Sequence, residues 1–396
     1  MEEFYNPNEE KLNKRRENYA DLLAKHRRLV VLRALIAIVG LILVVGIVRV
    51  VSSRKIYTDY NIKETYSRET ATSGNTLLLG RNILSYSNDG VSCSDASGKI
   101  IWNETYEMQN PIVAIKGDTA AIGDYDGGKI YVVNASAPIG EITTNLPIRY
   151  IDVSNDGVVA ATLDDGDVTW IYLYNAKGET IAYFKTSMNQ SGYPLSVSIS
   201  PNGNLVCVAY TLADTGRLKS SVAFFNFGEV GKNTQDHYMS GYDYDSAVVP
   251  YTGFMTSDVA FAVADNRLMF YEGGQKPVSK SEVLLDYEIQ SVYYNESAVA
   301  LISYDTTGEH KYRVQVYEPS GKLQMEQGFD VEYKNILLYK DNLYIYGDAE
   351  LAIYNTSGVE KYAGTLEQDI SMVIPSNTIS RFSIVGKESI AQIQLN

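Results

Sequence analysis

The sequence predicts an all-β protein, a β-propeller with eight blades, preceded by a single N-terminal transmembrane α-helix. Three observations predict this architecture: a weak repeat of short apolar strands, Gly-containing turns that follow many of those strands, and one long apolar run near the N-terminus. The composition agrees, because 32 Tyr and 30 Gly among 396 residues favour strands and tight turns over helices.

The repeat is marked by an alternating apolar strand that ends in a polar residue. These strands end at Asp95, Asn134, Asn175, Asn226, Glu272, Glu318, Asn355 and Asn396. The intervals run from 37 residues (Glu318 to Asn355) to 51 residues (Asn175 to Asn226), and most match the ~40–50 residues of a propeller blade. Seven blades remain an alternative if one unit is a separate hairpin, whereas a β-sandwich would not explain the near-constant interval.

The turns support the same reading. Gly-containing hairpins follow the marked strands at Asp95–Gly98, Asn175–Gly178, Glu318–Gly321 and Asn355–Gly358. Gly supplies the positive φ that such turns need. Two further short strands precede the marked strand, as in the runs that begin at Arg149 and Leu195. Four strands per unit is the layout of a propeller blade.

The last unit reaches Asn396 after three strands, so it needs an outer strand from elsewhere. We expect the segment Tyr57–Thr70 to supply it and close the ring, which removes exposed sheet edges. The predicted organisation is a cytoplasmic basic helical tail (1–28), a transmembrane helix (29–51), a linker with the closing strand (52–75) and the propeller (76–396).

The apolar run Leu29–Val51 is interrupted only by Arg33 and Arg49, near its ends. A spanning helix needs about 20 largely apolar residues, and terminal arginines can reach the headgroups. The 20 residues before this run contain seven basic residues, and the 20 after it contain four. This excess favours a cytoplasmic N-terminus. The prediction is a single-pass protein of the cell membrane with an extracytoplasmic propeller. A cleaved secretory signal is the alternative, although Val50–Ser53 is a poor cleavage site.

The repeat units resemble quinoprotein-like and WD40-like propellers. Trp102, four residues after Gly98, is similar to the blade-end tryptophan of the quinoprotein type, but Thr144, Ala182, Met325 and Tyr362 stand at that offset in other units. The whole layout resembles a gram-positive bacterial family of membrane-anchored proteins with an extracytoplasmic propeller and no established activity. That resemblance implies topology only.

Charge limits the partners. Residues 1–55 hold 11 basic and 6 acidic groups, so the remainder of the chain holds 23 (34 − 11) basic and 42 (48 − 6) acidic groups, a balance of −19. A domain of this charge repels nucleic acid and anionic lipid, and cations suit it better. With only Cys93 and Cys207, a disulfide framework is excluded, and two buried thiols in separate strands are favoured over one bridge.

Catalytic signals are scarce. The outer domain has two histidines, His237 and His310, both in polar contexts that favour solvated side chains over a catalytic dyad. No motif of a metalloprotease, serine hydrolase or nucleotide-binding protein occurs. No cofactor is expected, apart from a hard cation such as calcium.

Two acidic turns are the candidate cation sites. One contains Asp124 and Asp126, and the other contains Asp164, Asp165 and Asp167. Clustered carboxylates are the ligands of hard cations. The alternative is a solvated turn in which Asp and Gly serve the backbone.

A Tyr- and Asp-rich stretch in the longest unit is the candidate ligand site. We expect it to form the loop from blade four into blade five, on the same face as the acidic turns. Tyrosine rings beside carboxylates suit sugars or peptides. The candidate residues are Tyr238, Tyr242, Asp243, Tyr244, Asp245 and Tyr251.

These features favour a binding protein over an enzyme. The leading hypothesis is an envelope scaffold whose propeller recognises a protein, peptide or glycan, without nucleic acid. A carboxylate-based hydrolase of a cell-surface glycan or peptide is the alternative.

Overall fold

The computed structural model describes residues 26–44, 46, 54–68, 74–187, 191–214 and 217–396. The chain divides into two compact units, Met1–Ile56 and Tyr57–Asn396. All the strands among the described residues belong to the second unit.

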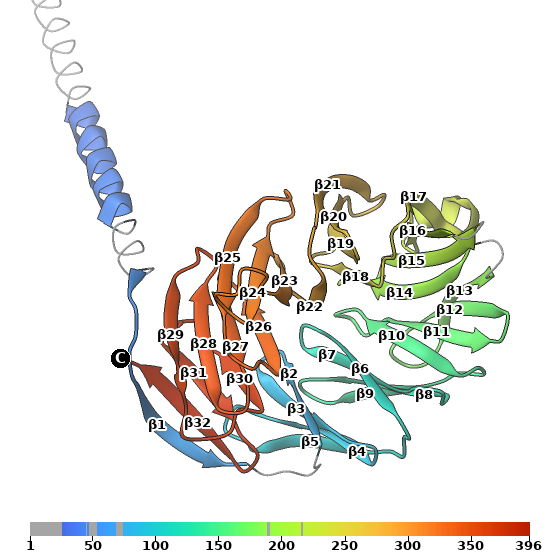
Figure 1. Ribbon diagram of the computed structural model, residues 1–396, viewed down its shortest axis with the longest axis horizontal. Helices are drawn as coiled ribbons and strands as arrows, with labels where there is room; N and C mark the ends of the chain where they lie inside the picture. Colours follow the sequence, from blue (N-terminus) through green and yellow to red (C-terminus); the bar gives the residue numbers. More distant parts are fainter. Residues whose placement is uncertain (1–25, 45, 47–53, 69–73, 188–190, 215–216) are drawn as a thin grey trace, which may run out of the picture. The chain divides into compact units, whose positions relative to one another are not determined.

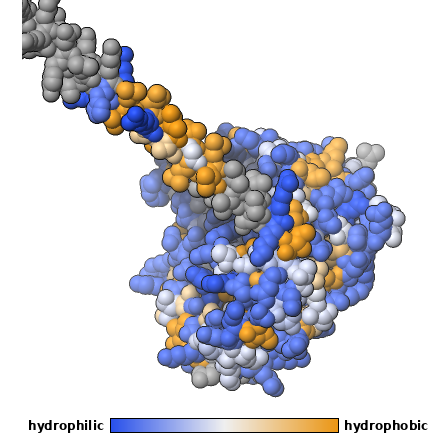
Figure 2. Space-filling model, turned by 90° about the vertical axis from the view of Figure 1, so that its left-hand side faces the viewer, coloured by the Kyte–Doolittle hydropathy of each residue, from blue (hydrophilic) through white to orange (hydrophobic). Residues whose placement is uncertain are grey.

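Residues 26–44 of the first unit form a helix whose large apolar side chains are exposed. Figure 2 shows this helix as mostly hydrophobic, whereas the face of the propeller in view is mostly hydrophilic. Among the described residues, no helix combines the length and the apolar character needed to cross a bilayer. The spanning helix expected over 29–51 is therefore not supported, and residues 45 and 47–51 of that range lie outside the description.

Eight four-stranded antiparallel sheets follow around a ring (Figure 1). Blade 1 comprises β2 (Asn75–Leu79), β3 (Asn82–Tyr86), β4 (Gly90–Ser94) and β5 (Ile100–Thr105). Blade 2 comprises β6 (Pro111–Lys116), β7 (Thr119–Asp124), β8 (Lys129–Asn134) and β9 (Pro138–Thr143). Blade 3 comprises β10 (Ile148–Val153), β11 (Val159–Asp165), β12 (Val168–Tyr174) and β13 (Thr180–Ser187). Blade 4 comprises β14 (Tyr193–Ile199), β15 (Leu205–Asp214), β16 (Arg217–Asn226) and β17 (Tyr238–Asp245), with short 3-10 helices η1 (Gly231–Asn233) and η2 (Gln235–His237) before β17.

The second half of the ring has the same plan. Blade 5 comprises β18 (Tyr251–Phe254), β19 (Val259–Ala264), β20 (Arg267–Glu272) and β21 (Val278–Leu284). Blade 6 comprises β22 (Ile289–Tyr294), β23 (Val299–Tyr304), β24 (Tyr312–Tyr317) and β25 (Leu323–Phe329). Blade 7 comprises β26 (Asn335–Tyr339), β27 (Asn342–Tyr346), β28 (Glu350–Asn355) and β29 (Glu360–Thr365). Blade 8 comprises β30 (Met372–Pro375), β31 (Arg381–Val385), β32 (Ser389–Leu395) and β1 (Tyr60–Ser67).

The eight-bladed propeller predicted from the repeat is thus confirmed. Every strand that marked the repeat is the third strand of its sheet. Eight buried apolar clusters lie between neighbouring blades, one at each junction, so burial between sheets holds the ring together. The smallest is at the junction of blades 8 and 1 and consists of Ile83, Met372, Ile374, Val385 and Ile390.

The polar residue after the third strand shapes the turn into the fourth. In blade 3, Asn175 Oδ1 accepts hydrogen bonds from the backbone N–H groups of Lys177 and Glu179, both at 3.0 Å. Gly178 adopts φ +88°, where a side chain would be strained. The amide side chain and the glycine together reverse the chain, which explains why these two residue types recur.

Ring closure occurs between β1 and β32, which pair antiparallel from Tyr60 opposite Leu395 to Ser67 opposite Ser389. The outer strand of blade 8 therefore comes from the segment Tyr57–Thr70, as predicted from the sequence. Residues 69 and 70 of that segment lie outside the described residues. Tyr57, 8% exposed, belongs to the apolar cluster of blades 7 and 8.

One expectation was wrong. The stretch from Tyr238 to Asp245 is the outer strand β17 and not a loop. Its aromatic and acidic residues alternate because successive side chains of a strand point to opposite faces. Only residues 246–250 form the connection from blade 4 to blade 5.

Candidate binding site

A cavity of about 790 Å³ lies between the outer parts of blades 3 and 4, and we call it the interblade groove. The strands β15 and β16 have ten residues each, longer than those of the other blades, and extend one wall of the groove. The lining residues are Trp170, Tyr183, Phe184, Lys185, Thr186, Ser191, Tyr210, Ser221, Ala223, Phe225, Asp236, Tyr238, Gly241 and Asp243.

Aromatic residues of both blades are prominent among the lining residues. On blade 3, the centroid of the Tyr183 ring lies 5.9 Å from that of Trp170 and 5.1 Å from that of Tyr172, with Tyr172 stacked. On blade 4, the Tyr238 ring meets Phe225 edge-on at 5.9 Å. Tyr183 and Tyr238 remain 59% and 49% exposed, so two rings held by other rings are available to a ligand.

Polar groups of both signs accompany the rings. Lys185 comes from β13, Asp243 from β17, and Asp236 from η2. Asp236 and His237 adopt φ +52° and +60°, a region that non-glycine residues rarely occupy. The His237 ring packs on Phe227 with centroids 4.7 Å apart, and its Nδ1 lies 3.1 Å from the backbone oxygen of Asn226. His237 is therefore a partly buried residue, and not a solvated histidine.

The six Tyr and Asp candidates do not form one site. Tyr238 and Asp243 line the interblade groove, whereas Tyr242 points to blade 5, where its hydroxyl donates to Pro277 O and accepts from Ser279 N–H, both at 3.1 Å. Tyr244 is buried with its hydroxyl 2.7 Å from that of Tyr271. These two tyrosines join blades 4 and 5.

The remaining two candidates are separate again. Asp245 lies 3.9 Å from Lys219 Nζ at the surface. Tyr251 begins the innermost strand of blade 5, and burial raises its pKa. Neither residue lines the interblade groove.

The two acidic turns share one arginine. Arg149 Nε donates to Asp164 Oδ2 at 2.8 Å, and its Nη1 pairs with Asp126. Hydrogen bonds to Asp164 and Tyr125 raise the pKa of the Arg149 guanidinium. The Arg149 guanidinium thus joins Asp126 of the first acidic turn to Asp164 of the second.

Other acidic-turn residues also have protein partners. Asp124 Oδ1 accepts from the N–H groups of Gln109 and Asn110, at 3.0 and 2.9 Å. Asp165 Oδ2 accepts from Trp170 Nε1 at 3.3 Å, which ties this turn to the groove. Asp167 lies at the tip of the second turn. Within the described residues, no group of three His, Cys, Asp or Glu is placed to hold a metal ion.

A polar cluster in the central channel was not predicted. Lys116 Nζ, at the end of β6, lies 3.2 Å from Phe254 O and 3.1 Å from Tyr294 Oη, at the ends of β18 and β22. Burial lowers the pKa of Lys116 and raises the pKa of the nearby Asp152. Blades 2 and 6 are four positions apart in a ring of eight, so Lys116 spans the channel. The signal in the sequence was a lysine at the end of an otherwise apolar innermost strand.

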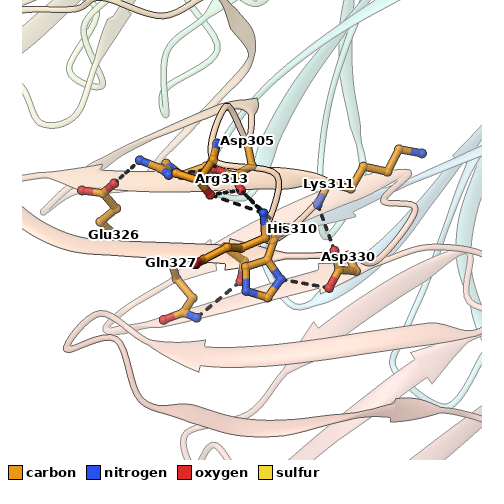
Figure 3. A network of polar contacts seen from close by, with 10 residues as sticks. Asp305, His310, Lys311, Arg313, Glu326, Gln327 and Asp330 are labelled. Atoms are coloured by element: carbon orange, nitrogen blue, oxygen red, sulfur yellow. Dashed lines mark hydrogen bonds and ion pairs between the residues drawn. The ribbon is translucent and has the colours of Figure 1, made fainter.

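His310 forms a surface network with acidic and basic partners (Figure 3). Its Nδ1 lies 2.9 Å from Asp330 Oδ2, and this hydrogen bond raises its pKa. Arg313 donates to Asp305 at 2.7 Å and to Glu326 at 2.6 Å. The adjoining cavity, about 200 Å³, is lined by Asp305, His310, Arg313 and Glu326 together with Thr307, Glu309, Gln327 and Gly328, and no serine or cysteine is among the described lining residues.

The two cysteines are free and buried in blades 1 and 4. Burial raises the pKa of the Cys93 thiol to about 11 and that of Cys207 further. Both behave as small apolar core residues, as expected.

Comparison with known proteins supports the fold. No curated protein matches the sequence. Among solved structures, BamB from Moraxella catarrhalis is 12% identical with a TM-score of 0.50, over 85% of this chain and 100% of that chain. Sqt1 from Chaetomium thermophilum is 13% identical with a TM-score of 0.51, over 87% of this chain and 100% of that chain. At such identities the likeness concerns the fold alone. A family model matches residues 53–395, and the chain therefore belongs to the family of unknown function DUF5711.

Proposed function

We propose that this protein is a membrane-anchored binding propeller of the cell envelope, and that its interblade groove recognises a peptide segment of a protein partner. The observation that carries the proposal is the pair of exposed rings, Tyr183 on blade 3 and Tyr238 on blade 4, among the residues that line a cavity of about 790 Å³.

The groove offers enough apolar area to hold a ligand. Covering most of both exposed rings would remove on the order of 200 Å² from water, which corresponds to about 5 kcal/mol before the entropic cost of binding. Tyrosine is also enriched among the residues that dominate binding energies at protein interfaces. Because each ring already packs on other rings, little side-chain entropy is lost when a ligand covers it.

A peptide fits the polar groups better than a sugar does. Lys185 on blade 3 and Asp243 on blade 4 bring a cation and an anion to the groove, and a polypeptide carries both signs while a neutral glycan carries neither. β13 and β17 are outer strands, and no further strand pairs with them in the described sheets. Their free edges can hydrogen-bond an extended chain.

The anchor is proposed from the N-terminal segment. The helix of residues 26–44 exposes large apolar side chains from Leu29 to Val44, which water does not favour. The basic flank before it favours a cytoplasmic N-terminus and an extracytoplasmic propeller. Protease added to intact cells should then digest the chain beyond residue 56 and leave an N-terminal tag intact. A tag removed from outside would contradict this topology.

The hydrolase alternative has no support in the described residues. The acidic turns that motivated it have their carboxylates bound to Arg149, to backbone N–H groups or to Trp170.

The groove is tested by peptide selection on the full-length chain in detergent. Peptides selected from a phage-displayed library on the wild-type protein should lose binding to the double variant Tyr183→Ser, Tyr238→Ser, by about tenfold or more. The matched control is Tyr304→Ser, because Tyr304 is 55% exposed and stacks on Tyr312 in blade 6. The control should retain binding.

Two results would contradict the proposal. Peptides that bind the double variant as well as the wild type would remove the groove from consideration. Glycans on an array that bind the wild type and fail on the double variant, with no peptide recovered, would make the groove a sugar site.

A further inference from the structure

A second cavity, of about 590 Å³, lies at the junction where the ring closes, between blades 8 and 1. We call it the closure groove. Three basic side chains line it: Lys63 on β1, Arg81 in the turn between β2 and β3, and Arg381 at the start of β31. The groove therefore brings together residues from the beginning and the end of the propeller.

Lys63 reaches this position because β1 is irregular there. Ile62 pairs with Ile393 and Glu64 pairs with Gln392, so no partner residue is left for Lys63. A β-bulge of this kind turns the direction of the extra side chain. The bulge lies in β1, the strand that closes the ring.

The charge of the closure groove is opposite to that of the domain. Beyond residue 55 the chain carries 23 basic and 42 acidic groups. Within the described part of the chain, none of Lys63, Arg81 and Arg381 forms an ion pair; Arg381 Nε only donates to Gln394 Oε1 at 2.7 Å. The one carboxylate in the lining, Asp95, accepts hydrogen bonds from Ser97 and Lys99 of its own turn.

Near charges outweigh distant ones at physiological salt. The screening length is about 8 Å at 0.15 M, so a ligand in the groove interacts with the lining cations far more than with acids elsewhere on the disc. Apolar side chains form part of the lining, including the buried Ile374 and the partly exposed Ala96. A cavity of this size with an apolar wall is larger than a simple inorganic anion requires and suits side chains of a polypeptide.

We propose that the closure groove binds an acidic peptide segment of a protein partner, with carboxylates at Lys63, Arg81 and Arg381 and apolar side chains beside Ala96. Such a ligand contacts β1 and blade 1 at once. Binding therefore stabilises the closed ring and slows amide exchange in β1.

The probe is a fluorescein-labelled dodecapeptide of four Glu-Leu-Asp repeats, titrated into the full-length chain and followed by anisotropy. The test variant is Lys63→Gln, Arg81→Gln, Arg381→Gln. The matched control is Lys177→Gln, Lys276→Gln, Lys322→Gln, which changes net charge equally at turns between third and fourth strands. The test variant should bind at least about tenfold more weakly, and the control should change by less than about threefold.

Every other result counts against the proposal. Absence of probe binding to the wild type, or equal weakening in both triple variants, would overturn it. If inorganic phosphate displaces the probe at equal concentration, the groove is an anion site without peptide recognition. If vesicles that contain anionic lipid capture the wild-type chain and not the test variant, the groove is a site for lipid headgroups. All three cations are exposed, so their replacement should leave the fold intact. The single variant Arg81→Gln and a thermal melt of each protein distinguish a loss of binding from a loss of folding.

Discussion

Lys116 Nζ lies 3.1 Å from the hydroxyl oxygen of Tyr294, across the central channel of the ring. The same ammonium donates to Phe254 O, so one side chain from blade 2 reaches blades 5 and 6. A buried cation with two acceptors and a nearby carboxylate, Asp152, is a polar link in a ring otherwise held by apolar junctions.

Lys116→Met should lower the free energy of unfolding by about 1–3 kcal/mol, because Phe254 O and the Tyr294 hydroxyl lose their donor. Lys322→Met, at an exposed position, is the control and should have no measurable effect.

The stability should also depend on pH through Lys116. Burial lowers the pKa of Lys116 below 10.5, so at pH values just below 10.5 the unfolded chain binds more protons than the folded chain. The contribution of Lys116 to stability therefore rises with pH just below 10.5. Denaturant unfolding of the three proteins at neutral pH and near pH 10 measures both effects; a stability gap that shrinks at the higher pH would contradict this account.

Deletion of residues 57–67 should destabilise the propeller by at least about 2 kcal/mol, since it exposes the edge of β32 and removes the buried Tyr57 ring. A deletion of equal length within the first 25 residues is the control. Hydrogen exchange provides an independent reading, because the amides of β1 that pair with β32 should exchange slowly. Fast exchange throughout β1 would mean that the ring is not closed by this strand.

Arg149→Gln should lower the free energy of unfolding by about 0.5–1 kcal/mol, which is the range for a partly exposed ion pair. Millimolar calcium should leave the Tm of the wild-type protein unchanged, because the guanidinium occupies the carboxylates of Asp126 and Asp164. Thermal melts with calcium and with a chelator test this directly. A calcium-dependent rise in the wild-type Tm would restore the cation site at the acidic turns.

The pKa of His310 should fall when Asp330 is replaced by Asn, because the hydrogen bond to Asp330 is the main cause of its elevation above 6.5. An elevated histidine pKa means that the contact stabilises the fold below the unfolded pKa, and that this contribution is lost as the pH rises through the folded pKa. NMR titration of the imidazole protons, in the wild type and in Asp330→Asn, measures the change in the pKa of His310. An unchanged His310 pKa in Asp330→Asn would show that the pair does not form in solution.

The fold was accessible from the sequence because several blades repeat the same local turn after their third strand. Asn175 and Gly178 form a turn that needs only nearby atoms, so its signature survives in the chain even where the apolar positions vary. Ring closure by residues within Tyr57–Thr70 followed from strand counting, since a blade of three strands leaves an open edge. These inferences depend on contacts that are local or imposed by the ring.

The candidate site depends on contacts that no local pattern encodes. The interblade groove joins Trp170 and Tyr238, which come from different blades. The alternation of Tyr242, Asp243, Tyr244 and Asp245 is a strand signal, and it could have corrected the loop assignment. Strict alternation along β17 would place Tyr238 and Asp243 on opposite faces. They share a face because the register of β16 and β17 shifts where Phe224 pairs with Ser240 and Phe225 pairs with Tyr238, and the alternation in the sequence does not show this shift.

The most direct test of the interblade groove uses its own tryptophan. The chain has two, and Trp102 is 9% exposed in blade 1, so the variant Trp102→Phe leaves Trp170 as the sole reporter. A peptide selected on the wild-type groove, added at saturation as judged by anisotropy, should shift the emission of Trp170 to shorter wavelength because the ligand excludes water from the ring. Saturating peptide with an unchanged Trp170 emission spectrum would show that recognition takes place elsewhere on the propeller.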